Sequence, residues 1–164
     1  AVKDQNSDIR IAGLRIASEL KLDLIPLLKI LVKDSSAQVR RECALSLRHN
    51  SSSEAPELWA QLAQQHDGKN RWYLEALGIG ADKNEDKFFA AWLEAARENW
   101  NTFAGHDIIW RSRSPKALPY LTKIIRSEKT SKQERPRYFR ALDFIPQCPE
   151  KEIALLELLT LVGH

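Results

Sequence analysis

The sequence has two cysteines, no methionine and no long apolar run, and each of these absences excludes something. Two cysteines are too few for a scaffold that disulfides hold together. No stretch approaches the roughly 18 consecutive apolar residues of a transmembrane helix, so we expect no membrane span. The chain starts at Ala1 and shows no signal-peptide pattern, and without any Met it reads as a piece of a longer protein.

The residues that are present favour one folded domain. A length of 164 residues matches a single domain, residues 1–164, and a hydrophobic content of 43% excludes general disorder. Lys and Arg number 25 against 22 Asp and Glu, a net charge of +3, and the two signs alternate along the chain. This mixture is typical of solvated helix faces and differs from a basic tail that neutralises phosphates.

Apolar residues recur with helical spacing along nearly the whole chain. Leu24, Leu27, Leu28 and Leu31 follow the i, i+3, i+4, i+7 pattern of one apolar helix face, and no stretch alternates with the period of two that a half-buried strand needs. The chain is therefore predicted to be all-α. The expected helices are 7–20, 22–34, 37–48, 54–66, 70–80, 85–99, 104–113, 115–127, 133–145 and 149–162.

The predicted helices resemble one another at a fixed interval. Ile9-Arg10 returns as Val39-Arg40, 30 residues later (40 − 10), and residues 72–77 match residues 137–142 at about twice that spacing. A period in the low thirties, made of two helices and two turns, is typical of an α-solenoid. We therefore expect a right-handed α-α superhelix of about five two-helix repeats.

Three sites carry signals for helix ends. Ser114 before Pro115 combines an N-cap side chain with a proline in the first turn. Ser131 and Glu134 have the spacing of a capping box. Gly68 after Asp67 predicts that the preceding helix ends with a residue in the left-handed backbone conformation.

One unit resembles the HEAT repeat. The family has a proline within the first helix, an aspartate in the turn and a Val-Arg pair at the start of the second helix, matched here by Pro26, Asp34, Val39 and Arg40. Pro26 is expected to bend its helix from an interior position. The resemblance implies that Asp34 and Arg40, six residues apart, bridge successive repeats. Pro119 suggests a second such helix, although Ser127 stands where the aspartate would be.

The second half of the chain carries a narrower resemblance. Residues 71–82, 88–93, 107–113 and 136–141 look like the HEAT-repeat, armadillo-like region of large exported bacterial proteins of the planctomycete type. Those proteins join a membrane-bound sugar-dehydrogenase-like propeller to a haem-binding c-type cytochrome domain. The resemblance implies a periplasmic or extracellular accessory module. The haem motif CxxCH is absent here, so no cofactor is expected in this segment.

Metal binding is not expected from the sequence. His49, His66, His106 and His164 lie in different predicted units, and neither cysteine has a partner at ligand spacing. Cys43 falls on an apolar helix face and is expected in the core, whereas Cys148, before a proline, is expected in an exposed turn.

No catalytic residue is expected either. His106 and Asp107 are adjacent, and neighbouring residues on a helix point about 100° apart, so they do not form an acid–base pair. Asp107 is instead expected to cap or charge the first turn of its helix.

The strongest functional signal is a set of aromatic and arginine residues on the second helices of the repeats, which line the concave face in HEAT solenoids. Trp, Tyr and Arg dominate binding interfaces, which favours a groove. The alternative is that Trp72, Trp110 and Phe139 fill the core, with the arginines in ladders with Asp and Glu, and burial is the favoured reading of each aromatic. The proposed groove residues are Arg71, Trp72, Tyr73, Trp110, Arg111, Arg113, Arg137, Tyr138 and Arg140.

Two functions follow from these patterns. The first is a non-catalytic scaffold that docks a partner protein, expected to be the neighbouring domains of its own parent chain. The alternative is a nucleic-acid-binding module similar to alkylpurine DNA glycosylases of the HEAT-like fold, superficially suggested by Trp72, Trp110, Asp107, Arg111 and Arg137. A net charge of +3 is a weak footprint for nucleic acid, so the scaffold is favoured.

Overall fold

The structure, a computed structural model, describes residues 1–162, and all regular secondary structure in them is helical, as predicted. The chain forms two compact units, the first Ala1–Arg97 and the second beginning at Glu98. None of the helices in the described residues is long and apolar enough to span a bilayer.

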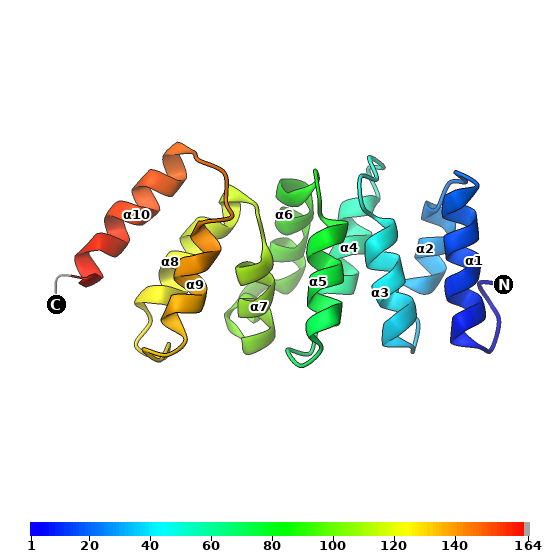
Figure 1. Ribbon diagram of the computed structural model, residues 1–164, viewed down its shortest axis with the longest axis horizontal. Helices are drawn as coiled ribbons and strands as arrows, with labels where there is room; N and C mark the ends of the chain where they lie inside the picture. The colour runs from blue at the N-terminus through cyan, green and yellow to red at the C-terminus, as the bar shows by residue number, and fades with distance from the viewer. Residues whose placement is uncertain (163–164) are drawn as a thin grey trace. The chain divides into compact units, whose positions relative to one another are not determined.

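Unit 1 consists of two rows of helices. One row is α1 (Ser7–Glu19), α3 (Ala37–Ser46) and α5 (Arg71–Gly80), and the other is α2 (Ile25–Leu31), α4 (Ala55–Ala63) and α6 (Glu85–Ala96). Each helix packs against the next one in its own row, and α2–α3 and α4–α5 join the rows (Figure 1). This order, in which neighbouring hairpins stack, is what the repeat in the sequence predicts.

The core of unit 1 lies between the rows. Its largest side chains are completely or almost completely buried, among them Leu14, Leu28, Leu62, Phe88 and Phe89. Cys43 is also fully buried, as expected from its helix face, and burial raises the pKa of its thiol to about 12.

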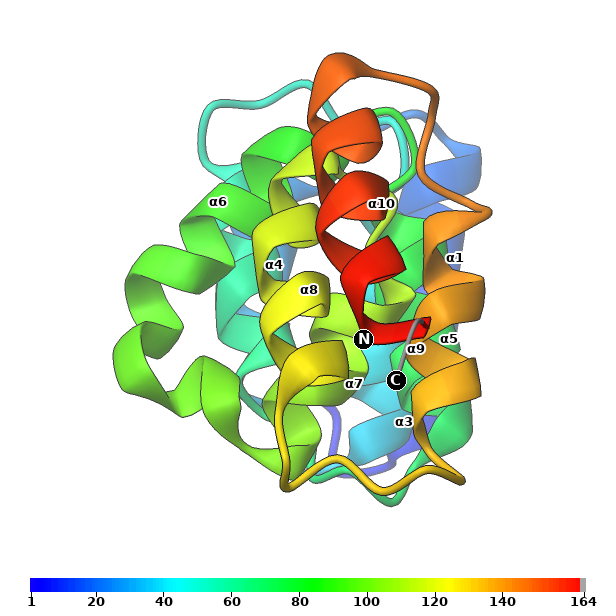
Figure 2. The same ribbon diagram turned by 90° about the vertical axis from the view of Figure 1, so that its left-hand side faces the viewer.

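Unit 2 continues the alternation with its own helices. A 3₁₀ turn (Arg97–Asn101) leads into α7 (Phe103–Arg111), and a second one (Pro115–Ala117) precedes α8 (Leu118–Arg126). Then follow α9 (Arg135–Leu142) and α10 (Pro149–Val162). Helix α7 packs on α9, and α8 packs on both α9 and α10, which lies in front in Figure 2. The core includes Ile109, Leu118, Leu121 and Ile125.

Of the three predicted signals for helix ends, Ser114 marks the start of a helix, whereas the bonds of residues 131–134 and the angle of Gly68 occur in turns outside α9 and α4. The Ser114 hydroxyl accepts a hydrogen bond from the Lys116 N–H at 3.1 Å, with Pro115 in the first turn. Ser131 and Glu134 exchange the two bonds of a capping box, at 3.1 and 3.3 Å. Gly68 has a φ of 75°, in the left-handed region that glycine adopts without strain.

The two prolines bend no helix, contrary to our expectation for Pro26. Helix α2 is shorter than predicted because it begins at Ile25, so Pro26 stands in its first turn, as Pro119 does in α8. The first N–H groups of a helix have no partner within it, so a proline there costs no hydrogen bond.

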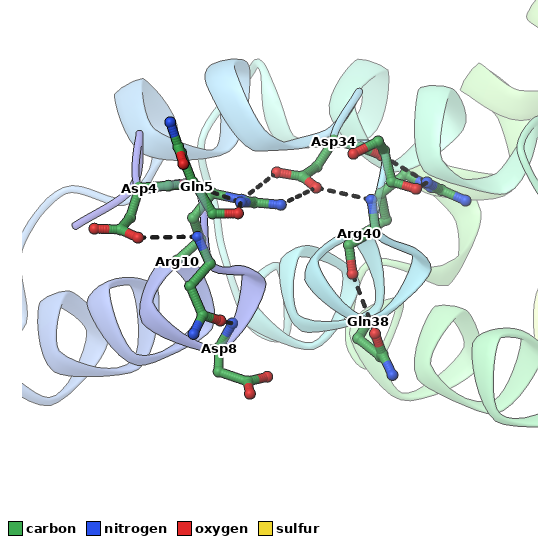
Figure 3. Close-up of polar contacts among 10 residues, drawn as sticks. Asp4, Gln5, Asp8, Arg10, Asp34, Gln38 and Arg40 are labelled. Carbon is green, nitrogen blue, oxygen red and sulfur yellow. Dashed lines mark hydrogen bonds and ion pairs between the residues drawn. The ribbon is translucent and has the colours of Figure 1, made fainter.

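The repeat signature links successive repeats through a residue that the prediction did not pair. The Asp34 carboxylate accepts two hydrogen bonds from the Arg10 guanidinium on α1, at 2.7 and 2.8 Å (Figure 3). Arg40 donates to the main-chain carbonyl of Asp34 at 2.6 Å and lies outside the carboxylate pair. Val39, the remaining signature residue, is fully buried. Asp34 therefore bridges repeats, but with the arginine of the preceding one.

Candidate functional site

The nine predicted groove residues fall in both compact units. Three lie on α5 in unit 1 and the other six lie on or beside α7 and α9 in unit 2.

On α5 the structure separates Trp72 from Tyr73, although burial is the favoured prediction for both aromatic side chains. Trp72, which we expected in the core, has 72% of its surface exposed, whereas Tyr73 retains only 3%. The Tyr73 hydroxyl donates to the Leu62 carbonyl at 2.9 Å, and the Arg40 guanidinium lies 5.7 Å from its ring centre. Tyr73 is therefore a core residue that ties α5 to α4, and the binding-groove prediction is wrong for it.

The third predicted residue on α5 makes a contact within its own helix. Arg71 is exposed, and its Nε donates to Glu75 at 2.7 Å, one helical turn further on. Such exposed pairs contribute little to stability, about 0–1 kcal/mol. Trp72 is thus the one large exposed aromatic on α5, and Ile79, two turns on, is 42% exposed.

In unit 2 the structure brings together Asp107, Trp110 and Arg137. Arg137 donates to the Asp107 carboxylate at 2.5 Å, and its guanidinium stacks over the Trp110 ring, 4.3 Å from the ring centre. The Trp110 N–H in turn donates to the main-chain carbonyl of Arg137 at 3.1 Å. Asp107 is 5% exposed, so its charge is neutralised by Arg137 inside the protein, and the expected role as a helix cap is wrong. Thr102 caps this helix instead.

A second arginine–aromatic pair occurs in the same unit. The Arg113 guanidinium sits 4.1 Å from the ring centre of Phe144, which is 50% exposed. Arg140 is exposed on α9, between Arg137 and Phe144 in helical spacing. We refer to Trp110, Arg113, Arg137, Arg140 and Phe144 as the α7–α9 face. It presents two aromatic rings that arginines hold in place, and one more cation.

The predicted residues Tyr138 and Arg111 differ in their exposure. Tyr138 is 3% exposed and packs edge-on against His106, with 6.1 Å between ring centres, so it belongs to the core and not to a groove. Arg111, the last residue of α7, is half-buried. Burial lowers the pKa of His106, although the negative charges of Asp107 and Glu134 act to raise it.

His106 and Asp107 point to different partners. The His106 ring nitrogen Nε2 lies 3.0 Å from the Asn101 side-chain oxygen, and the Asp107 carboxylate is bound by Arg137. Neither is placed to activate a nucleophile through the other. Within residues 1–162, no group of three or more His, Cys, Asp and Glu side chains has the arrangement of a metal site. His164, one of the four histidines for which no metal binding is expected, lies outside the described residues.

Phe144 is absent from the predicted set. The signal that points to it is the spacing Arg137, Arg140, Phe144, which would place all three on one face of a helix that reached residue 145. The predicted end near residue 145 is too late, because α9 ends at Leu142, so Phe144 stands in the following turn and its ring is placed by Arg113.

Comparison with known proteins identifies no relative. No protein-family model matches the sequence, and neither curated proteins nor solved structures give a significant match.

Proposed function

We propose that this chain is a non-catalytic helical-repeat scaffold that binds a partner protein through the α7–α9 face. The observation that carries the proposal is the fixed geometry of Trp110, which Arg137 holds by stacking and by a hydrogen bond while Asp107 anchors Arg137. Trp and Arg contribute most of the free energy of binding in protein interfaces. Side chains held in place before binding lose less conformational entropy when a partner arrives.

The proposal extends to the architecture and the partner. The rows of helices are part of a right-handed HEAT-type superhelix, with α7 and α9 among the helices that line its concave side. The resemblance of residues 71–82 and 107–113 to exported dehydrogenase–cytochrome proteins supports neighbouring domains of the same parent chain as partners. The α7–α9 face carries three arginines and two aromatic rings, so a partner surface with acidic and apolar side chains fits it best.

The alternative function, nucleic-acid binding, has one observation in its favour. Trp110, Asp107 and Arg137, three of the residues that carry the superficial resemblance to DNA glycosylases, contact one another in unit 2. However, the Asp107 carboxylate is 5% exposed and bound by Arg137, so it is not available to activate a water molecule. The protein scaffold is therefore the better-supported function.

The test uses exposed members of the α7–α9 face and leaves its anchored pair intact. Arg137→Glu is unsuitable, because it would place two carboxylates together in a half-buried position and destabilise the fold. We therefore choose Arg140→Glu combined with Phe144→Ser, since both side chains are exposed. The control is Lys129→Glu, which makes the same change of charge in the loop before α9.

The measurement is calorimetric titration of the chain with the separately expressed domains that adjoin it in the parent protein. We expect the double variant to weaken binding by about tenfold or more and the control to leave it unchanged. Equal binding by the double variant and the original chain contradicts the proposal. In a parallel titration with duplex DNA at about 50 and 200 mM salt, binding that weakens steeply with salt would support the alternative.

A further inference from the structure

The start of the chain repeats the turn between α2 and α3. Val2-Lys3-Asp4 returns as Val32-Lys33-Asp34, 30 residues later (34 − 4). The Asp4 carboxylate accepts a hydrogen bond from the Asn6 N–H at 2.9 Å, and Asp34 accepts one from the Ser36 N–H at 2.8 Å. Asn6 and Ser36 are the N-cap residues of α1 and α3. The first residues therefore enter α1 as residues 32–36 enter α3.

The two arginines confirm this register. Arg10 donates to the main-chain carbonyls of Asp4 and Gln5 at 2.7 and 2.9 Å. Arg40 makes the same pair of bonds, six and five residues back, to Asp34 and Ser35 at 2.6 and 3.1 Å (Figure 3). Residues 4–10 and 34–40 thus have the same local structure, and α1 is the second helix of a repeat, as α3 is.

One contact that Asp34 makes has no counterpart at Asp4. The Asp34 carboxylate binds the guanidinium of Arg10, from the helix one place earlier in the row. Among the described residues no arginine side chain donates to the Asp4 carboxylate, which is exposed. Its position is that of an acceptor for an arginine from a preceding helix.

An apolar stripe on α1 is uncovered in the same way. Ile9, Ile16 and Leu20 are 44%, 59% and 65% exposed, and their spacing of seven and four residues places them on one helix face. Val39, which corresponds to Ile9 in α3, is 0% exposed because α3 has a repeat on each side. The same position is therefore buried where a preceding repeat is present and exposed on α1.

We propose that the outer face of α1 is a stacking surface for a further two-helix repeat of the same type. Its first helix runs directly into Val2, as α2 runs into Val32, and an arginine in the first turn of its second helix binds Asp4. The occupant is covalently linked, because residues 2–4 already have the sequence and the contacts that join a first helix to its second. This inference rests on the repeat organisation proposed above, and it is independent of the α7–α9 face.

The test supplies such a repeat from the chain itself. A copy of residues 4–30 is inserted directly before Ala1, so that the copied α2 continues into Val2 and the copied Arg10 reaches Asp4. We expect the melting temperature to rise by about 5 °C or more. Amide exchange in α1 should slow about tenfold or more, since its outer face is then covered. Asp4→Asn should lower the melting temperature of the extended chain and leave that of the original chain nearly unchanged.

The control carries the same insertion with Arg10→Met and Leu28→Gln in the copied segment only. An equal gain from this control, or no gain from the unaltered copy, overturns the proposal. If the full copy prevents folding, a copy of residues 22–30 alone supplies the first helix, and slower amide exchange in α1 is still required. The original chain could instead form concentration-dependent dimers that the substitution Ile16→Glu dissociates. That result would assign the outer face of α1 to a second copy of the chain and overturn the proposal of a covalently linked repeat. Loss of partner binding in the docking test leaves all these readouts unaffected.

Discussion

At the scale of single residues, two arginine–carboxylate pairs join α1 to the next repeat and differ in burial. Arg10 and Asp34 have side chains only 12% and 9% exposed, whereas Arg15, which binds Glu42, is 64% exposed. Burial pushes the pKa of Asp34 upward, but the hydrogen bonds from Arg10 and the Ser36 N–H outweigh it and hold this pKa below 3.8. The ionised form of Asp34 is therefore the one that the folded state favours.

Arg10→Met is predicted to lower the melting temperature at pH 7 by about 4–8 °C, because it leaves the Asp34 carboxylate half-enclosed without its partner. The matched change Arg15→Met should cost about 2 °C or less. A carboxyl group whose pKa is lower in the folded state than in the unfolded state stabilises the fold at pH values above its unfolded pKa. This stabilisation is lost as the pH falls through its folded pKa. The difference between Arg10→Met and the original chain should therefore shrink below about pH 4. Equal losses for the two variants in thermal melts would contradict this assignment.

The sequence could identify the important residues more easily than their roles. Trp72 and Tyr73 are adjacent, so a rotation of about 100° decides which ring enters the core. The spacing of apolar residues around them is compatible with either phase, so burial is the favoured prediction for both rings and is correct only for Tyr73. Likewise Asp34 was recognisable as a bridge, but the choice of Arg10 over Arg40 depends on packing between helices 24 residues apart.

At the scale of helices, α5 approaches α3 through a glycine. A Cβ atom on Gly80 would lie 2.0 Å from the Ala44 carbonyl oxygen, and a backbone atom cannot move aside as a side chain can. Gly13 on α1 is the matched case, because its Cβ would come close only to the side chain of Ala1, at 2.7 Å, at the end of the chain, and would make ordinary contacts of 3.6 Å with Val2. The close packing of α3 on α5 therefore requires glycine, whereas α1 does not depend on one.

Gly80→Ala is predicted to destabilise the fold by about 1–3 kcal/mol, since it forces two backbones apart and outweighs the better helix propensity of alanine. Gly13→Ala should be neutral or stabilise by up to about 1 kcal/mol. Urea unfolding of both variants measures the difference. A Gly80→Ala variant as stable as the original chain would show that the two helices have room to separate.

The helices themselves were predictable from apolar spacing, and their ends were predictable where a side chain acts locally. Ser114 acts through a bond two residues away, so its sequence context suffices. The bonds of Ser131 with Glu134 and the left-handed φ of Gly68 also form as expected, but α9 begins at Arg135 and α4 ends at Ala63, so neither marks a helix end. Pro26 was placed too far inside its helix because the apolar pattern begins before the helix does. Leu22, in that leading stretch, is 56% exposed and lies outside α2.

At the scale of the whole molecule, stability is divided between nearest neighbours. Within each compact unit, polar contacts join residues about one repeat apart, from one helix of a row to the next, such as Gln65 to the Val32 carbonyl and Arg126 to the Glu157 carbonyl. In such arrays the free energy of unfolding is a sum over repeats and their interfaces, so a local change is felt first in its own neighbourhood. The two units, Ala1–Arg97 and the unit from Glu98, are therefore expected to respond separately.

Leu28→Ala and Leu121→Ala test that division with two leucines that are each 0% exposed, one in each unit. Each substitution should cost about 2–5 kcal/mol through lost apolar contacts and a residual cavity. We predict that Leu28→Ala speeds amide exchange in α1–α4 and leaves α8–α10 protected, whereas Leu121→Ala does the reverse. Hydrogen exchange followed by mass spectrometry, in low denaturant, resolves the two sets of peptides. Equal loss of protection throughout residues 1–162 in both variants would show one cooperative core and contradict nearest-neighbour stability.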